Sequence, residues 1–367
     1  MRVLLVTNDF PPRVGGIQNY LWNIYRGLGV DVRVLAPSFP GDAAFDRAAA
    51  VEVVRWPHAV AWPTRALERK IAALSRDADV VAFGAVLPMN LLATRVDKPV
   101  VVHTHGFEVA WARAPLMRQA LRRIGRAASA ITVVSDFTAR FIDRAVGQPD
   151  KIHLLRTGVD LDRFSPDVDA KAIRARYDID ERPVVACVSR LVARKGQDKI
   201  IEAMPAVRAR VPHATALIVG GGPSRKRLES KARALGLQEA VVFTGEVPEK
   251  ELAAHYAAGD IFAMPCRSRY AGLEVEGLGL VYLEAQACAR PAITGDSGGA
   301  PEAVVPEETG LVVPGNAVGP LAQAVARLLA DPERTRAMGQ AGRRFVEREH
   351  RWEDVIARYR AMLDSIR

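Results

Sequence analysis

Two glutamates with glycines between them are well placed for binding chemistry. Glu276 and Glu284 bracket the run GLGLVYL, in which Gly277 and Gly279 allow a backbone to approach a ligand closely. The apolar residues that follow predict the start of a helix, whose first turn offers free N–H groups and a partial positive charge. The stretch therefore indicates a site for anions or hydroxyl groups, with carboxylates about 10 Å apart by helical rise. Two solvent-exposed glutamates around a buried helix would give the same spacing.

A second candidate cluster consists of cations after the apolar run PVVACVS. Arg190 and Lys195 flank the loop RLVARKG, which ends in Gly196. Two fixed cations at the end of a strand suit a diphosphate leaving group, because they neutralise the charge that develops on it. A solvated basic loop is the alternative interpretation.

A histidine and a glycine pair follow two strand-like runs in the first half of the chain. His105 comes directly after PVVVHT, where it could donate a hydrogen bond to a substrate hydroxyl or serve as a structural histidine. His103, two residues earlier, is a weaker candidate. Gly15 and Gly16 follow the first strand and open a helix, a turn suited to a diphosphate or to the close passage of a ligand. A plain turn would look the same.

Two further loops could meet a nucleotide. Gly220, Gly221 and Gly222 follow the run ATALIV and indicate close backbone approach, either to a nucleotide or to the sheet. This triplet lacks the final glycine of a dinucleotide fingerprint. Val247 follows the run AVVFTG and could meet a base through its backbone.

Several kinds of chemistry find no support in the sequence. It contains no H-E-x-x-H, no P-loop and no G-x-S-x-G, and no His/Asp cluster typical of a metal site. The 3 cysteines show neither metal nor disulfide spacing. We therefore expect no metal or other cofactor, and no nucleic-acid partner, because aromatic and basic residues are not interleaved.

Parallel strands would position these residues, and the chain alternates strand-like and helix-length segments as a parallel sheet requires. Short apolar runs without alternation are separated by helix-length segments in both halves, which predicts an α/β fold with two Rossmann-like domains. We place the boundary after residue 165, giving a first Rossmann-like domain over 1–165 and a second over 166–351. A helix over about 352–367 could pack back onto the first domain. Ligands of such sheets bind beyond the carboxyl ends of the strands, so a site between the two domains is expected.

The charge is uneven along the chain. The net charge is +9, and residues 1–165 carry 22 Lys/Arg against 15 Asp/Glu. A basic surface can attract phospholipid, nucleic acid or a phosphorylated substrate. No secretory signal follows Met1, and the longest apolar stretch, 80–93, is too short and too broken to span a bilayer. These features predict a cytoplasmic protein.

One segment could bind a membrane from its surface. In the predicted helix over 116–126, the arginines fall on one face, and Met117, Leu121 and Ile124 form an apolar face. Such a helix can lie on anionic lipid. An ordinary domain helix with a solvated charged face is the alternative. The basic residues in question are Arg118, Arg122, Arg123 and Arg126.

Taken together, the motifs resemble the retaining glycosyltransferases of family 4, which have the GT-B fold of two Rossmann-like domains facing each other across a cleft. The resemblance runs nearly end to end through NDFPPRVGGIQ, HTHGFE, SRLVARKGQD, VGGGP, the E-x₇-E pair and SGGAPE. Within that family the chain is similar to actinobacterial phosphatidylinositol mannosyltransferases. The resemblance implies transfer of a second, α-1,6-linked mannose from GDP-mannose to a phosphatidylinositol mannoside at the inner membrane surface, without a metal.

The resemblance also implies that residues 1–165 form the acceptor and membrane domain and residues 166–351 the nucleotide-sugar donor domain, and it implies roles for single residues. Arg190 and Lys195 would hold the donor diphosphate with Gly16 close by, and Glu284 would hold the ribose. Glu276 would meet sugar hydroxyls. The backbone amides of Gly277, Leu278 and Gly279 would also meet sugar hydroxyls. In the first domain, His105 would lie near the transferred sugar, and Asp9 belongs to the expected acceptor region.

Other functions remain open at this point. A UDP- or ADP-sugar transferase that makes a polysaccharide or a small glycoside would have the same fold. A non-transferase Rossmann enzyme, such as an NAD-dependent oxidoreductase, is disfavoured because no complete G-x-G-x-x-G occurs. The full set of cations and glutamates argues against a non-catalytic binding module. The sequence leaves open the oligomeric state and any role of Cys266.

Overall fold

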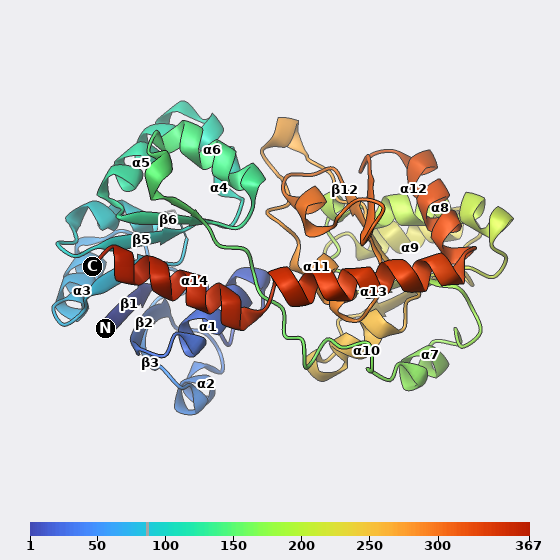
Figure 1. Cartoon of the computed structure of the whole chain (residues 1–367), viewed down its shortest axis with the longest axis horizontal. Coiled ribbons are helices and arrows are strands. Elements are labelled where there is room, and N and C mark those ends of the chain that lie inside the picture. Colours follow the sequence, from blue (N-terminus) through green and yellow to red (C-terminus); the bar gives the residue numbers. More distant parts are fainter. Residues whose placement is uncertain (86–87) are drawn as a thin grey trace. The chain divides into compact units, whose positions relative to one another are not determined.

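The computed structural model describes residues 1–85 and 88–367, and it divides into two compact units (Figure 1). The first unit contains residues 1–158 and 352–367, and the second contains residues 159–351. Each unit is built on one parallel sheet, with helices in the segments that connect the strands. The predicted α/β fold with two Rossmann-like domains is confirmed.

The division lies earlier than the predicted boundary after residue 165. The linker that begins at Val159 is bonded into the second unit, where the guanidinium of Arg343 donates to the carbonyls of Leu161 at 3.3 Å and Phe164 at 2.7 Å. These hydrogen bonds attach the linker to the second unit.

The first unit contains seven parallel strands in the order β3-β2-β1-β4-β5-β6-β7. The strands are β1 Arg2–Val6, β2 Asp31–Pro37, β3 Glu52–Trp56, β4 Val80–Phe83, β5 Val100–His103, β6 Ala130–Val133 and β7 Ile152–Leu154. The helices are α1 Gly16–Gly27, α2 Asp42–Ala48, α3 Arg65–Ser75, η1 Met89–Arg95, α4 Glu108–Arg113, α5 Pro115–Ala127, α6 Asp136–Val146, η2 Pro149–Lys151 and α14 Trp352–Ser365. The strand order reverses between β1 and β4, so the loops after these two strands border the crevice where such sheets bind ligands.

The C-terminal helix α14 belongs to the first unit and packs against α1 (Figure 1). Buried polar groups join it to the sheet, because the Tyr25 hydroxyl lies 2.6 Å from that of Tyr359 and 2.8 Å from Nε2 of His103. Nδ1 of His103 lies 2.7 Å from the hydroxyl of Thr132. Burial lowers the pKa of His103 to about 3. Both ring nitrogens of His103 are thus used within the core, which excludes this histidine as a site residue.

The second unit contains six parallel strands in the order β10-β9-β8-β11-β12-β13. The strands are β8 Val184–Val188, β9 Thr215–Val219, β10 Val241–Gly245, β11 Ile261–Met264, β12 Ala292–Gly295 and β13 Gly310–Val313. The helices are α7 Lys171–Arg176, η3 Ala193–Lys195, α8 Gln197–Arg210, α9 Arg225–Ala234, η4 Glu249–Glu251, α10 Leu252–Ala257, η5 Tyr270–Gly272, α11 Leu280–Ala287, η6 Ala300–Ala303, α12 Val318–Leu329 and α13 Pro332–Glu349. Here the order reverses between β8 and β11.

This reversal explains how residues far apart in sequence meet. β8 and β11 are paired neighbours, with Ile261 opposite Val185. The loops that leave their carboxyl ends therefore start side by side, and one carries the predicted cations while the other leads to the E-x₇-E pair. The core beneath is formed by strands whose side chains are buried on both faces, as parallel sheets require.

Candidate active site

The centre of the candidate site in the second unit is a cluster of one carboxylate and two cations. Nζ of Lys195 lies 2.8 Å from Oε2 of Glu276, and the guanidinium of Arg194 donates to the same oxygen. Lys195 and Glu276 are buried, with 9% and 8% of their surface exposed. The loops after β8 and β11 thus bring together two residues that the sequence places 81 positions apart.

The cations decide the charge state of Glu276. Burial alone would raise the pKa of this carboxyl group, but the charges of Lys195 and Arg194 outweigh burial and lower the pKa below its ordinary value of 4.5. Glu276 is therefore a carboxylate at neutral pH. A carboxylate held by two cations is suited to accepting hydrogen bonds from hydroxyl groups, and it is a weak nucleophile because its charge is already neutralised.

The SGGAPE turn fixes the backbone of Glu276. Its N–H donates to the hydroxyl of Ser297 at 3.2 Å, and its carbonyl accepts from the N–H of Gly299 at 2.9 Å. Gly298 has φ +60°, and a Cβ there would lie 2.1 Å from the carbonyl oxygen of Glu276. Only glycine permits this approach, so the turn formed by the SGGAPE segment supports the backbone of Glu276.

The two predicted cations are not equivalent. Lys195 is paired, whereas Arg190 is exposed, and its guanidinium has no hydrogen bond or ion pair with any described residue. Its backbone is held instead, because its carbonyl accepts from Nε2 of Gln197 at 3.2 Å. Arg190 is therefore an available cation on a fixed main chain.

Arg194 is the site residue that the sequence interpretation missed. It lies in η3 directly before Lys195, and besides Glu276 its Nε lies 3.6 Å from Oε1 of Glu274. The carboxylate of Glu274 also accepts from Arg269 at 3.2 Å. The sequence signal for Arg194 was the basic pair Arg194–Lys195 ahead of a glycine. The sequence interpretation gave a role in the site to Lys195 only.

The glycine triplet after β9 approaches the protein itself. Gly220 and Gly222 have φ values of +128° and +148°, and a Cβ on them would lie 2.3 Å from the carbonyl of Ser189 and 2.6 Å from that of Leu191. At Gly221 a Cβ would meet the side chain of Glu246. These glycines are explained by close packing against the loop after β8, and their contact with a nucleotide remains a prediction. The same holds for the half-buried Val247 and a base.

Helix α11 begins where the glycines predict. Gly279 precedes its first residue with φ +95°, and a Cβ there would lie 2.4 Å from the ring of Tyr282. Leu278 is buried and anchors the turn, while Gly277 is partly exposed. The N–H groups at the start of α11 follow directly after Glu276, which agrees with a site for hydroxyl or anionic groups.

Glu284 lies within α11 and is held differently from Glu276. Its Oε2 accepts from the hydroxyl of Tyr256 at 2.5 Å, and both side chains are buried. Burial raises the pKa of Glu284 to about 7, although the Tyr256 hydrogen bond and the charge of Arg163 oppose the rise. The two acids of the E-x₇-E pair thus have opposite electrostatic environments.

In the first unit, His105 follows β5 and is half-buried. Its Nε2 lies 2.7 Å from the carbonyl of Gly84, so Nε2 carries the proton and Nδ1 can only accept. Burial lowers the pKa of His105 to about 4, which keeps the ring neutral. The expectation that His105 donates to a substrate hydroxyl through its side chain is therefore corrected. Its backbone N–H is also occupied, because it donates to Glu108 at 3.0 Å.

The loop after β1 contains Asp9 and Gly16. The carboxylate of Asp9 accepts from Nε2 of Gln18 at 2.7 Å, and burial raises its pKa. Gly16 is the first residue of α1, and a Cβ there would have no heavy atom within 4 Å, so packing within the first unit does not require glycine at this position. Asp9, Gly16 and His105 lie in the first unit, and the other residues predicted to bind the donor lie in the second.

The structure corrects the apolar face of the predicted membrane helix. α5 exposes Arg118, Arg122 and Arg123, but Leu121 and Ile124 are 2% exposed and belong to the core of the first unit. The exposed apolar residues are instead at the start of the helix. Leu116 is 78% exposed and Met117 36%. Among the described helices, none is both long and apolar enough to span a bilayer.

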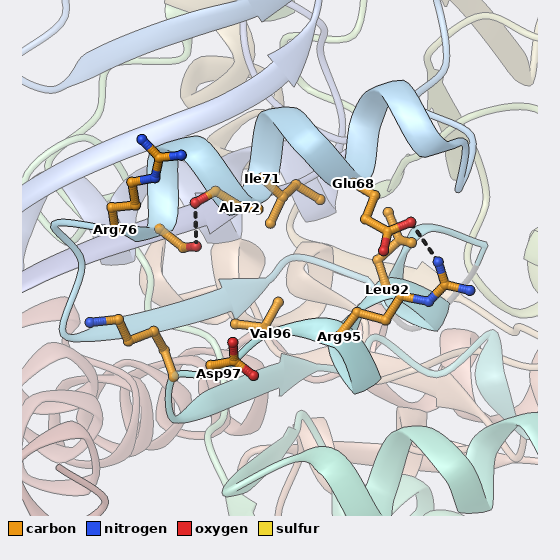
Figure 2. A pocket seen from close by; sticks show the side chains of 10 residues that line it. Glu68, Ile71, Ala72, Arg76, Leu92, Arg95, Val96 and Asp97 are labelled. Atoms are coloured by element: carbon orange, nitrogen blue, oxygen red, sulfur yellow. Dashed lines mark hydrogen bonds and ion pairs between the residues drawn. The ribbon is translucent and has the colours of Figure 1, made fainter.

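A pocket of about 170 Å³ lies elsewhere in the first unit, between α3 and the segment from η1 to β5 (Figure 2). Ile71 and Leu92 contribute to its apolar lining, and the ion pair between Glu68 and Arg95 lies at one end. None of the predicted site residues lines it. The pocket is therefore separate from the candidate active site.

Comparison with known proteins agrees with this geometry. Residues 14–163 match the model of Glycosyltransferase Family 4, and residues 169–345 match that of Glycosyl transferases group 1. Solved structures share the fold: Anabaena Alr3699/HepE, crystallised with UDP, superimposes with a TM-score of 0.85 at 19% identity over 100% of both chains. The chain belongs to the family 4 glycosyltransferases and has their GT-B fold.

Particular relatives are closer in sequence. The chain is 47% identical to the GDP-mannose-dependent alpha-(1-6)-phosphatidylinositol monomannoside mannosyltransferase of Mycobacterium tuberculosis, over 97% of this chain and 96% of that protein. The enzyme of the same name from Mycolicibacterium smegmatis is 46% identical over 100% and 99%. A Corynebacterium glutamicum enzyme named for the monoacylated acceptor is 43% identical over 99% and 98%.

Proposed function

We propose that this glycosyltransferase moves mannose from GDP-mannose to a phosphatidylinositol monomannoside and forms an α-1,6 linkage with retention of the anomeric configuration. The proposal is supported by the mannosyltransferases that match the chain over almost its full length. The observation that carries it is the buried cluster of Lys195, Arg194 and Glu276 at the strand reversal of the second unit. This cluster contains the charges that a sugar diphosphate donor requires.

The donor would be bound along the loops of the second unit. Arg190 is free to bind the diphosphate, and Lys195 would share its charge between Glu276 and the phosphate. Such fixed cations stabilise the negative charge that develops on the leaving group. Glu284 would accept from the ribose hydroxyls, and Glu276 from hydroxyls of the mannose.

The reaction would proceed by attack of the acceptor hydroxyl on the face from which the diphosphate leaves. The departing phosphate would take the proton of the acceptor hydroxyl, because Glu276 is already neutralised by its two cations. His105 would accept a hydrogen bond from a sugar hydroxyl through Nδ1. The cations would supply the positive charge that the leaving diphosphate needs, so the reaction is expected to need no divalent metal.

The membrane would be reached through the first unit. Arg118, Arg122 and Arg123 offer positive charge to anionic lipid, and Leu116 and Met117 are exposed beside them. The enzyme would then act as a peripheral protein at the inner face of the plasma membrane. The apolar contact would come from the first turn of α5, since the apolar face of that helix belongs to the core.

The experiment that tests this function is a donor screen. The purified protein is incubated with GDP-mannose, or with UDP- or ADP-sugars, together with a lipid extract that contains phosphatidylinositol monomannoside, and the products are analysed by mass spectrometry. The expected result is one added hexose on the monomannoside with GDP-mannose alone. Turnover of a UDP- or ADP-sugar with inactivity of GDP-mannose would overturn the proposal in favour of a polysaccharide or small-glycoside transferase.

A further inference from the structure

A buried tyrosine forms a hydrogen bond with the second acid of the E-x₇-E pair. Tyr256, at 1% exposure on α10, points its hydroxyl at Oε2 of Glu284 on α11 at a distance of 2.5 Å. The hydroxyl of a tyrosine in this setting donates, because burial and the charge of Glu284 raise the pKa of Tyr256 well above its ordinary value. The hydrogen bond to a carboxylate is charge-assisted and therefore strong.

The hydrogen bond with Tyr256 engages only one of the two carboxylate oxygens of Glu284. Oε2 of Glu284 is engaged, while Oε1 has no hydrogen-bond partner among the residues of 1–85 and 88–367. A carboxylate with one oxygen fixed inside the protein can turn only a little about its last bond. Its second oxygen is thereby given one direction in which to accept hydrogen bonds.

We propose that Tyr256 is a positioning residue, which holds Glu284 so that its free oxygen accepts from the ribose hydroxyls of the nucleotide donor. The inference rests on the proposed role of Glu284 as the ribose acceptor. Tyr256 does not touch the donor and acts only through Glu284. Its own position is fixed by packing, since the ring of Phe164 meets it edge-on at 5.7 Å.

The surroundings of Glu284 define the pH dependence that follows. The groups that face it are Tyr256 on α10, Arg163 in the linker, Glu249 in η4 and Cys288 beyond the end of α11. Arg163 and Glu249 form an ion pair with each other, so their opposite effects on Glu284 partly cancel. Removing the Tyr256 hydroxyl withdraws the main interaction that stabilises the charged form. More of Glu284 is then protonated near neutral pH, and donor affinity falls.

The test uses Tyr256→Phe, which removes one oxygen and keeps the shape of the ring. Tyr177→Phe is the matched control, because the Tyr177 hydroxyl lies 3.4 Å from His255, the neighbour of Tyr256 on α10, and does not contact Glu284. Donor KM, kcat and the affinity for GDP are measured in both variants from pH 6 to about 9. We expect Tyr256→Phe to raise donor KM roughly tenfold at pH 7 with kcat nearly unchanged. We also expect recovery at higher pH, and wild-type values for the control.

A double-mutant cycle separates positioning from general damage. If Tyr256 acts through Glu284, Tyr256→Phe has no further effect on donor KM once Glu284 has been replaced by Gln. An equal effect in both backgrounds, or an unchanged pH profile in Tyr256→Phe, would overturn the inference. An unchanged donor KM in Glu284→Gln alone would instead refute the proposed role of Glu284, so the two failures are distinguishable.

Discussion

Nζ of Lys195 lies 2.8 Å from Oε2 of Glu276, and both side chains are buried. A buried ammonium next to a carboxylate is fixed in place before any ligand arrives, which is the preorganisation that stabilises a leaving group. The same contact ties together the loops after β8 and β11. The pair therefore serves the architecture of the second unit as well as the proposed chemistry.

Replacing Lys195 by Ala is expected to reduce kcat by about 10²–10³, because the leaving diphosphate loses a preorganised cation. Steady-state transfer from GDP-mannose measures the effect. Lys199→Ala is the matched control, since Lys199 is paired with Glu202 one turn further along α8 and lies outside the cluster. Near-normal turnover of Lys195→Ala would remove this lysine from the mechanism.

Glu276→Gln is expected to destabilise the protein by about 3 kcal/mol at neutral pH, because two buried cations lose their carboxylate. The pKa of Glu276 is lower in the folded protein than its ordinary 4.5, so the folded state binds fewer protons there. The stabilisation is therefore complete above the unfolded pKa and disappears as pH falls through the folded pKa. Denaturant unfolding of both proteins between pH 7 and about 3 should show the difference shrinking; a constant difference would contradict the ion pair.

Donor affinity is expected to weaken as pH falls through about 7, the pKa of Glu284. Only the carboxylate form offers charge-assisted acceptance to ribose hydroxyls. Calorimetric titration with GDP across this range checks the effect. Glu284→Gln should raise donor KM, leave kcat nearly unchanged and abolish the pH dependence. Affinity that stays flat from pH 6 to about 8 in the wild-type protein would argue against an ionisable ribose contact.

Removal of divalent metals is expected to leave transfer unaffected, because cationic side chains supply the positive charge at the leaving group. The assay is run in excess EDTA, with added Mg²⁺ as the comparison. Activity that is lost in EDTA and restored by Mg²⁺ would require a metal in the mechanism.

Replacing Arg118, Arg122 and Arg123 by Ala is expected to weaken binding to anionic vesicles by roughly 1 kcal/mol per residue at low salt. Co-sedimentation with vesicles of anionic and of neutral phospholipid measures it. The exposed Leu116→Asp should also weaken binding, whereas Arg348→Ala, an exposed arginine of the second unit, is the control. Unchanged binding in the arginine variant would leave α5 as an ordinary domain helix.

The strands and the centre of the site were predictable, whereas side-chain partners were not. Parallel strands appear as apolar runs, so the loop with Lys195 could be placed at the end of a strand, whereas Glu276 was indicated by its spacing to Glu284 and the glycines between them. The contact of Tyr256 with Glu284 depends on how α10 packs on α11. The role of Leu121 was misjudged because an amphipathic helix has the same pattern whether its apolar face meets lipid or a core. The glycine triplet likewise could not reveal which backbone it approaches.

The placement of α14 has a consequence for the order of folding during synthesis. Tyr359 completes the buried polar group with Tyr25 and His103, yet it lies more than 250 positions after both. Residues 159–351 are synthesised before α14, so the second unit has its whole sequence while the first still lacks this helix. The first unit is thus completed after the second. Until α14 is in place, α1 lacks the helix that packs against it.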